Sequence, residues 1–165
     1  QQYGTSDRLA ARARLHARYT TAAMPWFDWV AGQFGIIDGD RVLEVGCGAG
    51  WLWEQTNIPV ATGTSITLVD LSPGMVDEAV ERVTGTRRFG SVRGEPADAQ
   101  SLPFDARSFD RVIANHMLYH LAEPASGVAE LARVVVDDGT VIAATTGSRH
   151  MQELWRIRAE MFGLA

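Results

Sequence analysis

The sequence lacks the features that define several large classes of protein. Its one cysteine, Cys47, cannot form an internal disulfide, and the 165 residues show neither a leader nor an apolar run long enough to cross a bilayer. An excess of basic residues is also lacking, since 15 Lys and Arg stand against 20 Asp and Glu, for a formal net charge of −5. Nucleic-acid binders usually carry a basic surface. We therefore expect a cytoplasmic protein with no nucleic-acid partner, no membrane partner and a small-molecule ligand.

The composition is that of an ordinary globular domain, with 46% hydrophobic and 21% charged residues. We expect a core domain over residues 36–146, preceded by N-terminal helices over 1–35 that cap its site and followed by a C-terminal helix over 147–165. The chain begins at Gln1 and ends inside that last expected helix. We expect it to be part of a longer protein.

Short apolar segments alternate with helical ones through the core. We expect strands at 41–45, 66–69, 88–92, 111–114 and 140–145, and helices at 50–56, 73–83, 123–135 and 151–162. This alternation predicts parallel strands joined by right-handed crossovers. The expected fold class is α/β, with an open, mainly parallel twisted sheet and helices on both faces.

Two further helices are expected before the core, over 6–19 and from Pro25 onward. In the second, the spacing of the apolar residues Trp26, Trp29, Val30 and Phe34 places them on one face. We expect that face to be buried.

Three glycines, Gly46, Gly48 and Gly50, follow the first expected strand at alternate positions. A strand-to-helix turn needs positive φ, and a ligand lying across the turn must approach a backbone without a Cβ. Such a turn alone also occurs in many α/β proteins. The second strand narrows the choice, because it ends in Asp70, 20 residues after Gly50, where nucleoside-binding folds hold ribose hydroxyls. Together these features predict a nucleoside cofactor.

Glu44, two residues before the first glycine, indicates which nucleoside is bound. A carboxylate would repel a pyrophosphate, but it would attract a cofactor that carries a sulfonium and an ammonium. The glycine spacing G-x-G-x-G also departs from the dinucleotide fingerprint G-x-G-x-x-G.

Four segments in order, 42–50, 70–75, 98–104 and 108–120, resemble the motifs of class I (Rossmann-like) S-adenosylmethionine-dependent methyltransferases. The resemblance covers about residues 36–146 and is greatest to the ubiquinone and menaquinone biosynthesis group. It implies S-adenosylmethionine as cofactor, S-adenosylhomocysteine as product, and in-line transfer of a methyl group to a small-molecule acceptor. It also implies a strand order of 3-2-1-4-5.

The resemblance implies cofactor contacts from eleven residues: Glu44, Gly46, Cys47, Gly48, Gly50, Asp70, Leu71, Met75, Asp98, Ala99 and Asn115. The glycine loop and Asn115 would line the methionyl part, with Glu44 near its ammonium, and Asp70 would bind the ribose. The remaining four would contact the adenine. For Asp98 a turn cap remains an alternative, and for Met75 plain core packing does.

Methyl transfer from a sulfonium requires no fixed catalytic signature, because the cofactor supplies the activation. An acceptor that must lose a proton would still gain from a general base, and His116 and His120 follow the fourth strand. We place His116 first because it follows Asn115 at the carboxyl end of that strand, although the two histidines could share a helical turn. No third ligand stands near them, so we expect no metal.

Complete members of the family have seven strands, and the residues after 145 include no two convincing strands. We expect the last two strands to be lacking and strand five to lie at an edge. An apolar edge favours pairing. We expect one of three explanations: the missing strands were lost or omitted, a partner chain covers the edge, as in a homodimer, or the helix at 151–162 covers it.

Two other functions stay open. One is a methyltransferase-like module that binds the cofactor or a partner protein without turnover. The other is a nicotinamide-dependent oxidoreductase, which shares only the physics of the glycine loop.

Overall fold

The computed structural model describes residues 18–147 and 152–163. Five parallel strands form one sheet in the order β3-β2-β1-β4-β5. The strands are β1 (Arg41–Val45), β2 (Ser65–Asp70), β3 (Ser91–Pro96), β4 (Phe109–Asn115) and β5 (Val135–Ala144). The α/β fold class and the strand order predicted from the sequence are confirmed.

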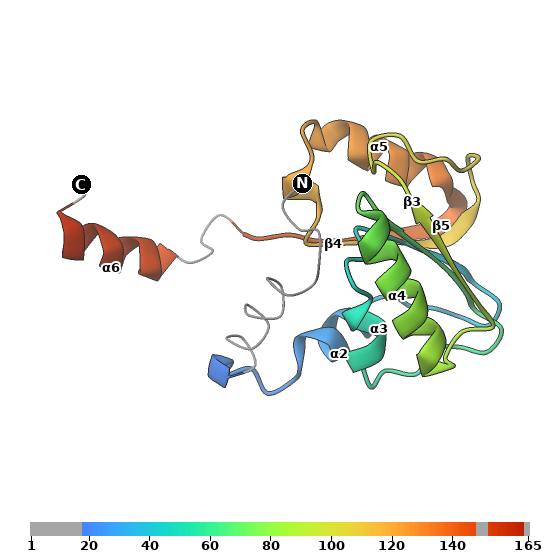
Figure 1. Cartoon of the computed structure of the whole chain (residues 1–165), viewed down its shortest axis with the longest axis horizontal. Coiled ribbons are helices and arrows are strands. Elements are labelled where there is room, and N and C mark those ends of the chain that lie inside the picture. Colours follow the sequence, from blue (N-terminus) through green and yellow to red (C-terminus); the bar gives the residue numbers. More distant parts are fainter. Residues whose placement is uncertain (1–17, 148–151, 164–165) are drawn as a thin grey trace.

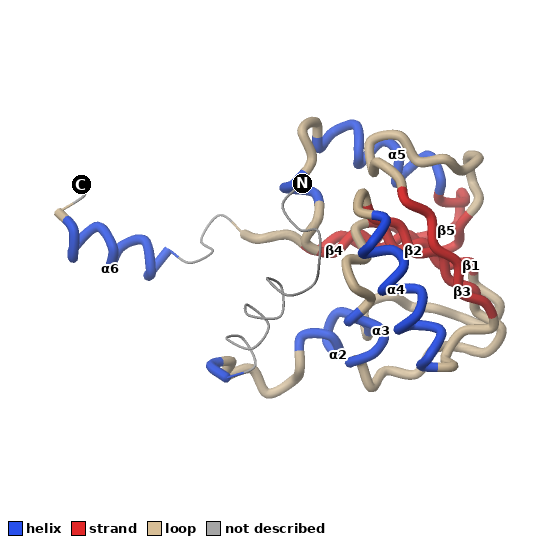
Figure 2. Tube along the Cα trace, viewed as in Figure 1, coloured by secondary structure: helices blue, strands red, loops and turns tan. Residues whose placement is uncertain are grey.

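Helices cover both faces of the sheet (Figures 1 and 2). On one face lie α2 (Trp26–Ala31), α3 (Trp51–Gln55) and α4 (Pro73–Thr86), and on the other lies α5 (Pro124–Val134). Successive side chains of a strand point to opposite faces, so Val42 packs into the first layer and Leu43 into the second. A short 3-10 helix, η1 (Leu118–His120), follows β4. The carboxyl ends of the parallel strands meet at one edge, where open α/β sheets bind ligands.

The third and fifth strands do not begin where the sequence predicted. Arg88 precedes β3, and its guanidinium donates hydrogen bonds to the backbone oxygens of Thr56 and Ile58. Gly94 lies inside β3, where α4 approaches so closely that a Cβ would stand 2.5 Å from Val76 Cγ1. β5 begins directly after α5, earlier than the expected residue 140. Both strands exist as predicted, but their boundaries differ from those expected.

Only part of the expected N-terminal face is buried. Val30 and Phe34 are each 2% exposed and pack in the core, whereas Trp26 and Trp29 are 42% and 48% exposed. The prediction of one buried face is wrong for the tryptophans, because the six-residue α2 attaches to the core through its last turn. The helix expected over 6–19 lies outside the described residues except at its last two positions.

The C-terminal helix does not cover the edge strand. β5 pairs with β4 alone, and α6 (Gln152–Phe162) stands apart from the sheet with no buried side chain among its described residues (Figure 1). The prediction that this helix covers the edge of β5 is therefore wrong for the described residues. Pairing of the edge with a second copy of the chain stays a prediction. None of the described helices is both long enough and apolar enough to span a membrane.

Candidate functional site

The glycine loop between β1 and α3 gives its three glycines different surroundings. All three have positive φ, and a Cβ at Gly46 would stand 2.5 Å from Met117 Cβ, while one at Gly50 would stand 3.0 Å from Ala79 Cα. Gly46 and Gly50 therefore allow close packing within the fold. A Cβ at Gly48 would meet nothing within 4 Å. Gly48 is the position at which the backbone of the loop faces open space, as close approach of a ligand requires.

Asp70, the last residue of β2, joins the glycine loop to the loop that follows its own strand. Its Oδ2 accepts a hydrogen bond from the Gly48 N–H at 3.0 Å, and its Oδ1 accepts one from the Ser72 N–H at 3.0 Å. The carboxylate is half-buried and its geometry is fixed. Each oxygen has a further lone pair, so the group can still accept hydrogen bonds from a diol. The predicted placement at the strand end is confirmed, and the ribose contact stays a prediction.

Glu44 lies inside the core, at the face of β1 that meets α3. The residue is 3% exposed, and Trp53 donates its indole N–H to the Glu44 Oε2 at 2.6 Å. Burial raises the pKa of the Glu44 carboxyl to about 8, the Trp53 hydrogen bond opposes that rise, and the negative charge of Asp70 adds to it. Sequence reasoning missed Trp53, although a tryptophan at the third position of the helix after the loop was a possible signal.

Asn115 ends β4 beside the glycine loop's parent strand, since β1 pairs directly with β4. Its Oδ1 is buried and has no hydrogen-bond partner, one of two such atoms among the described residues. An unsatisfied buried carbonyl costs about 1–3 kcal/mol. A ligand that donates a hydrogen bond to this oxygen would remove that cost.

His116 has a backbone φ of 54°, a left-handed conformation, and its N–H donates to the Ala144 oxygen at 2.7 Å. The imidazole is half-buried and lies 5.1 Å from the Trp26 ring, centroid to centroid. Since η1 begins at Leu118, His116 and the exposed His120 do not share a helical turn. That expectation is wrong, because the left-handed residue breaks the helical path. The role of His116 as a base stays a prediction.

The residues expected at the adenine differ in exposure. Leu71 is 64% exposed, whereas Met75 is 2% exposed, which fits the alternative of core packing. Asp98 Oδ1 accepts a hydrogen bond from the Gln100 N–H at 2.9 Å, so the alternative of a turn cap is present, with the carboxylate still exposed. Ala99, beside it, is 7% exposed. The adenine contacts of all four stay predictions.

The described side chains favour neither a reactive cysteine thiolate nor a metal site. Burial raises the pKa of the Cys47 thiol well above its usual range, which disfavours a reactive thiolate. In the part of the chain that the structure describes, no three His, Cys, Asp or Glu side chains gather where they could hold a metal ion.

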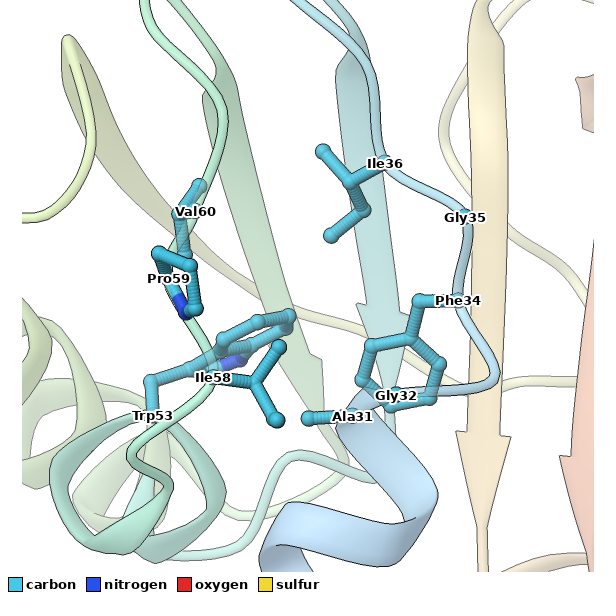
Figure 3. A pocket seen from close by; sticks show the side chains of 9 residues that line it. All are labelled: Ala31, Gly32, Phe34, Gly35, Ile36, Trp53, Ile58, Pro59 and Val60. Carbon is cyan, nitrogen blue, oxygen red and sulfur yellow. The ribbon is translucent and has the colours of Figure 1, made fainter.

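A separate shallow pocket lies among α2, the turn before β1 and the segment 58–60 (Figure 3). Phe34, Ile36, Trp53 and Ile58 are among its lining residues. None of the residues predicted to bind the cofactor lines it. Trp53 connects it to the Glu44 carboxyl through the indole hydrogen bond.

Comparison with known proteins agrees with this geometry. The sequence pattern of the methyltransferase domain family matches residues 43–143. A demethylmenaquinone methyltransferase of Clavibacter sepedonicus is 33% identical over 106 residues, 64% of this chain and 41% of that protein. A ubiquinone/menaquinone biosynthesis C-methyltransferase of Citrifermentans bemidjiense is 26% identical over 117 residues, 71% of this chain and 50% of that protein. The chain thus spans about half the length of these relatives or less.

The fold is also similar to that of a solved methyltransferase structure. The crystal structure of a SAM dependent methyltransferase from Aquifex aeolicus superposes with a TM-score of 0.57 at 24% identity, covering 71% of this chain and 62% of that one. At this identity the likeness shows the fold alone. The family pattern matches more than half of the sequence and falls on the parallel sheet with its glycine loop, so this chain belongs to the methyltransferase domain family.

Proposed function

We propose that this chain carries the cofactor-binding part of an S-adenosylmethionine-dependent methyltransferase that acts on a small-molecule acceptor. One arrangement carries the proposal. At the carboxyl ends of β1, β2 and β4 stand the open backbone of Gly48, the fixed carboxylate of Asp70 and the unsatisfied oxygen of Asn115. Gly48 lets the cofactor approach the backbone closely, Asp70 can accept hydrogen bonds from the ribose diol, and Asn115 can accept one from the methionyl ammonium.

Each part of the cofactor has a proposed partner. Asp70 would accept hydrogen bonds from the ribose hydroxyls through the lone pairs that the backbone leaves unused. Leu71 would cover one face of the adenine, since its side chain is 64% exposed beside Asp70. Asn115 would accept a hydrogen bond from the methionyl ammonium. Glu44 would add a charge that becomes favourable once the ammonium is near.

Bound S-adenosylmethionine supplies an activated methyl group for in-line displacement by an acceptor. The protein's contribution is to hold the acceptor in line and to exclude water. Where the acceptor is an acidic hydroxyl or carbon, a proton must leave it. His116 is the proposed base, because it follows Asn115 directly at the end of β4.

The acceptor that we propose is a small molecule. The two relatives are named for quinone biosynthesis. The net charge of −5 supports a small molecule over a polyanionic nucleic acid. We also propose that the uncovered edge of β5 pairs with a second copy of the chain.

Thermal unfolding with two ligands tests the proposal. S-adenosylhomocysteine at a concentration 100 times its Kd would add about 2.7 kcal/mol to the stability and raise Tm, whereas NADH would leave Tm unchanged. Stabilisation by NADH alone would overturn the proposal in favour of an oxidoreductase. Stabilisation by S-adenosylhomocysteine without methylated product, across a broad panel of acceptors, would favour a binding module.

A further inference from the structure

The segment that follows β3 carries two of the residues expected at the adenine, Asp98 and Ala99, without a helix or strand to support them. We call residues 97–104 the base loop. Ala99 and Leu102 in this loop are 7% and 5% exposed, and they pack in the core layer under α5. Buried backbone groups must be paired, so a buried loop needs hydrogen-bond partners from other elements. Those partners fix the position of the loop.

The last turns of α5 supply two of these partners, Glu130 and Arg133. Glu130 Oε2 accepts a hydrogen bond from the Leu102 N–H at 2.7 Å. The Arg133 guanidinium donates to the Leu102 oxygen at 3.0 Å and to the Phe104 oxygen at 2.7 Å. Glu130 and Arg133 also pair with each other, with 2.7 Å between Arg133 Nε and Glu130 Oε1. The planar guanidinium holds one carboxylate and two carbonyl oxygens at once, so Leu102 is fixed through both of its backbone groups.

The first turn of α5 is joined to the base loop through Gln100. Its side-chain Oε1 accepts a hydrogen bond at 2.8 Å from the N–H of Glu123, the residue before the helix. The backbone N–H of Gln100 donates to Asp98 Oδ1 at 2.9 Å, and its side-chain Nε2 donates to the same oxygen at 3.2 Å. The orientation of the Asp98 carboxylate therefore depends on α5 through a single intervening residue.

The helix that makes these contacts is itself fixed on the sheet. Leu131 and Val134 of α5 are 1% and 0% exposed and belong to the same core layer as the buried residues of the base loop. A ligand-binding loop keeps its geometry when packed elements and hydrogen bonds behind it hold it in place. Surface ion pairs alone contribute little to stability, but this pair is bonded to the backbone of a loop.

We propose that α5 positions the site of the cofactor base, through Gln100, Glu130 and Arg133. These three positioning residues hold the base loop so that Asp98 and Ala99 accept adenine and disfavour other bases. The inference rests on the proposed function, which places a nucleoside at the neighbouring strand ends. The three residues act through the loop and do not touch the base.

Two ligands that differ only in the base test the inference. Binding of S-adenosylhomocysteine and of S-inosylhomocysteine is measured by calorimetry. The second ligand has an oxygen in place of the 6-amino group, so it offers no donor to Asp98 at that position. We expect the wild-type chain to bind S-adenosylhomocysteine about 10- to 100-fold more tightly. Equal affinity for the two ligands would overturn the inference, because the loop would then select no base.

Variants locate the origin of the preference. Arg133→Met removes the guanidinium and should lower the preference for adenine by about 3- to 10-fold. Glu130→Gln keeps one acceptor oxygen and should retain most of the preference. Arg88→Met is the matched control, because Arg88 also donates to two backbone oxygens, those of Thr56 and Ile58. It should lower Tm and leave the preference unchanged.

A second variant covers the case in which Arg133→Met does not fold. Gln100→Leu removes the side-chain bonds to Asp98 and to the Glu123 N–H, and it should lower the preference in the same way. The full wild-type preference in either folded variant, or its loss in Arg88→Met, would contradict the assignment. A wild-type chain that binds neither ligand would instead be a failure of the proposed function, seen before any variant is made.

Discussion

Trp53 donates its indole N–H to the Glu44 carboxyl at 2.6 Å, inside the core and next to the glycine loop. The hydrogen bond joins the helix after the loop to the strand before it. Desolvation outweighs this bond, so the pKa of Glu44 rises to about 8 and the group holds its proton at neutral pH in the ligand-free chain. A buried acid that is neutral when alone and charged beside an ammonium would link pH to both stability and binding.

The stability of the ligand-free chain should fall as pH rises from 6 to 8. The folded state keeps the Glu44 proton up to about pH 8, whereas the unfolded chain loses it near 4.5, so the folded state binds more protons between these values. The contribution is fully present below pH 4.5 and is lost as pH rises through 8. We expect wild type to lose about 2 kcal/mol relative to Glu44→Gln between pH 6 and 8, by urea unfolding. Parallel pH curves for the two proteins would contradict this.

Binding of S-adenosylhomocysteine should release a proton near neutral pH. The ligand ammonium favours the ionised form of Glu44, so affinity should rise with pH up to about 8, by at most about tenfold per unit. Calorimetry in phosphate and in Tris, whose ionisation enthalpies differ, should give different heats for wild type and the same heat for Glu44→Gln. Identical heats for wild type in both buffers would show that Glu44 does not ionise on binding.

Asp70→Ala should weaken binding of S-adenosylhomocysteine by about 1.5–3 kcal/mol, the range for charge-assisted hydrogen bonds. It should also lower Tm, because the N–H groups of Gly48 and Ser72 lose their acceptor. Asp70→Asn, which keeps one acceptor oxygen, serves as the control. Its affinity for S-adenosylhomocysteine should lie between those of wild type and Asp70→Ala. Unchanged affinity in a folded Asp70→Ala protein would show that the ribose lies elsewhere.

The glycine loop and the parallel α/β sheet could be predicted because both follow from local rules: glycines after a strand, an acid at the end of the next strand and regular alternation of strands and helices. The strand order was predicted from the resemblance of four ordered segments to a known family. The Glu44–Trp53 hydrogen bond could not be predicted, since it depends on the packing of α3 on β1. Nor could the exposure of Trp26 and Trp29, because helical spacing gives a shared face and not what covers it.

Gly48→Ala and Gly50→Ala should affect different properties. A Cβ at Gly48 meets nothing, so we expect a loss of only about 1–2 kcal/mol from the left-handed backbone, together with weaker cofactor binding. Gly50→Ala adds a clash at 3.0 Å with Ala79 Cα and should cost roughly 2–4 kcal/mol. Denaturant unfolding and calorimetry on both proteins give the comparison. The opposite ranking in stability would mean that the loop faces the cofactor differently.

Direct calorimetric titration of the wild-type chain with S-adenosylhomocysteine tests the central claim that the ends of β1, β2 and β4 form a methyl-donor site. We predict saturable binding at about one site per chain, which Asp70→Ala weakens and NADH does not compete with. The absence of any binding heat for a folded wild-type chain at millimolar ligand, in two buffers, would contradict the account.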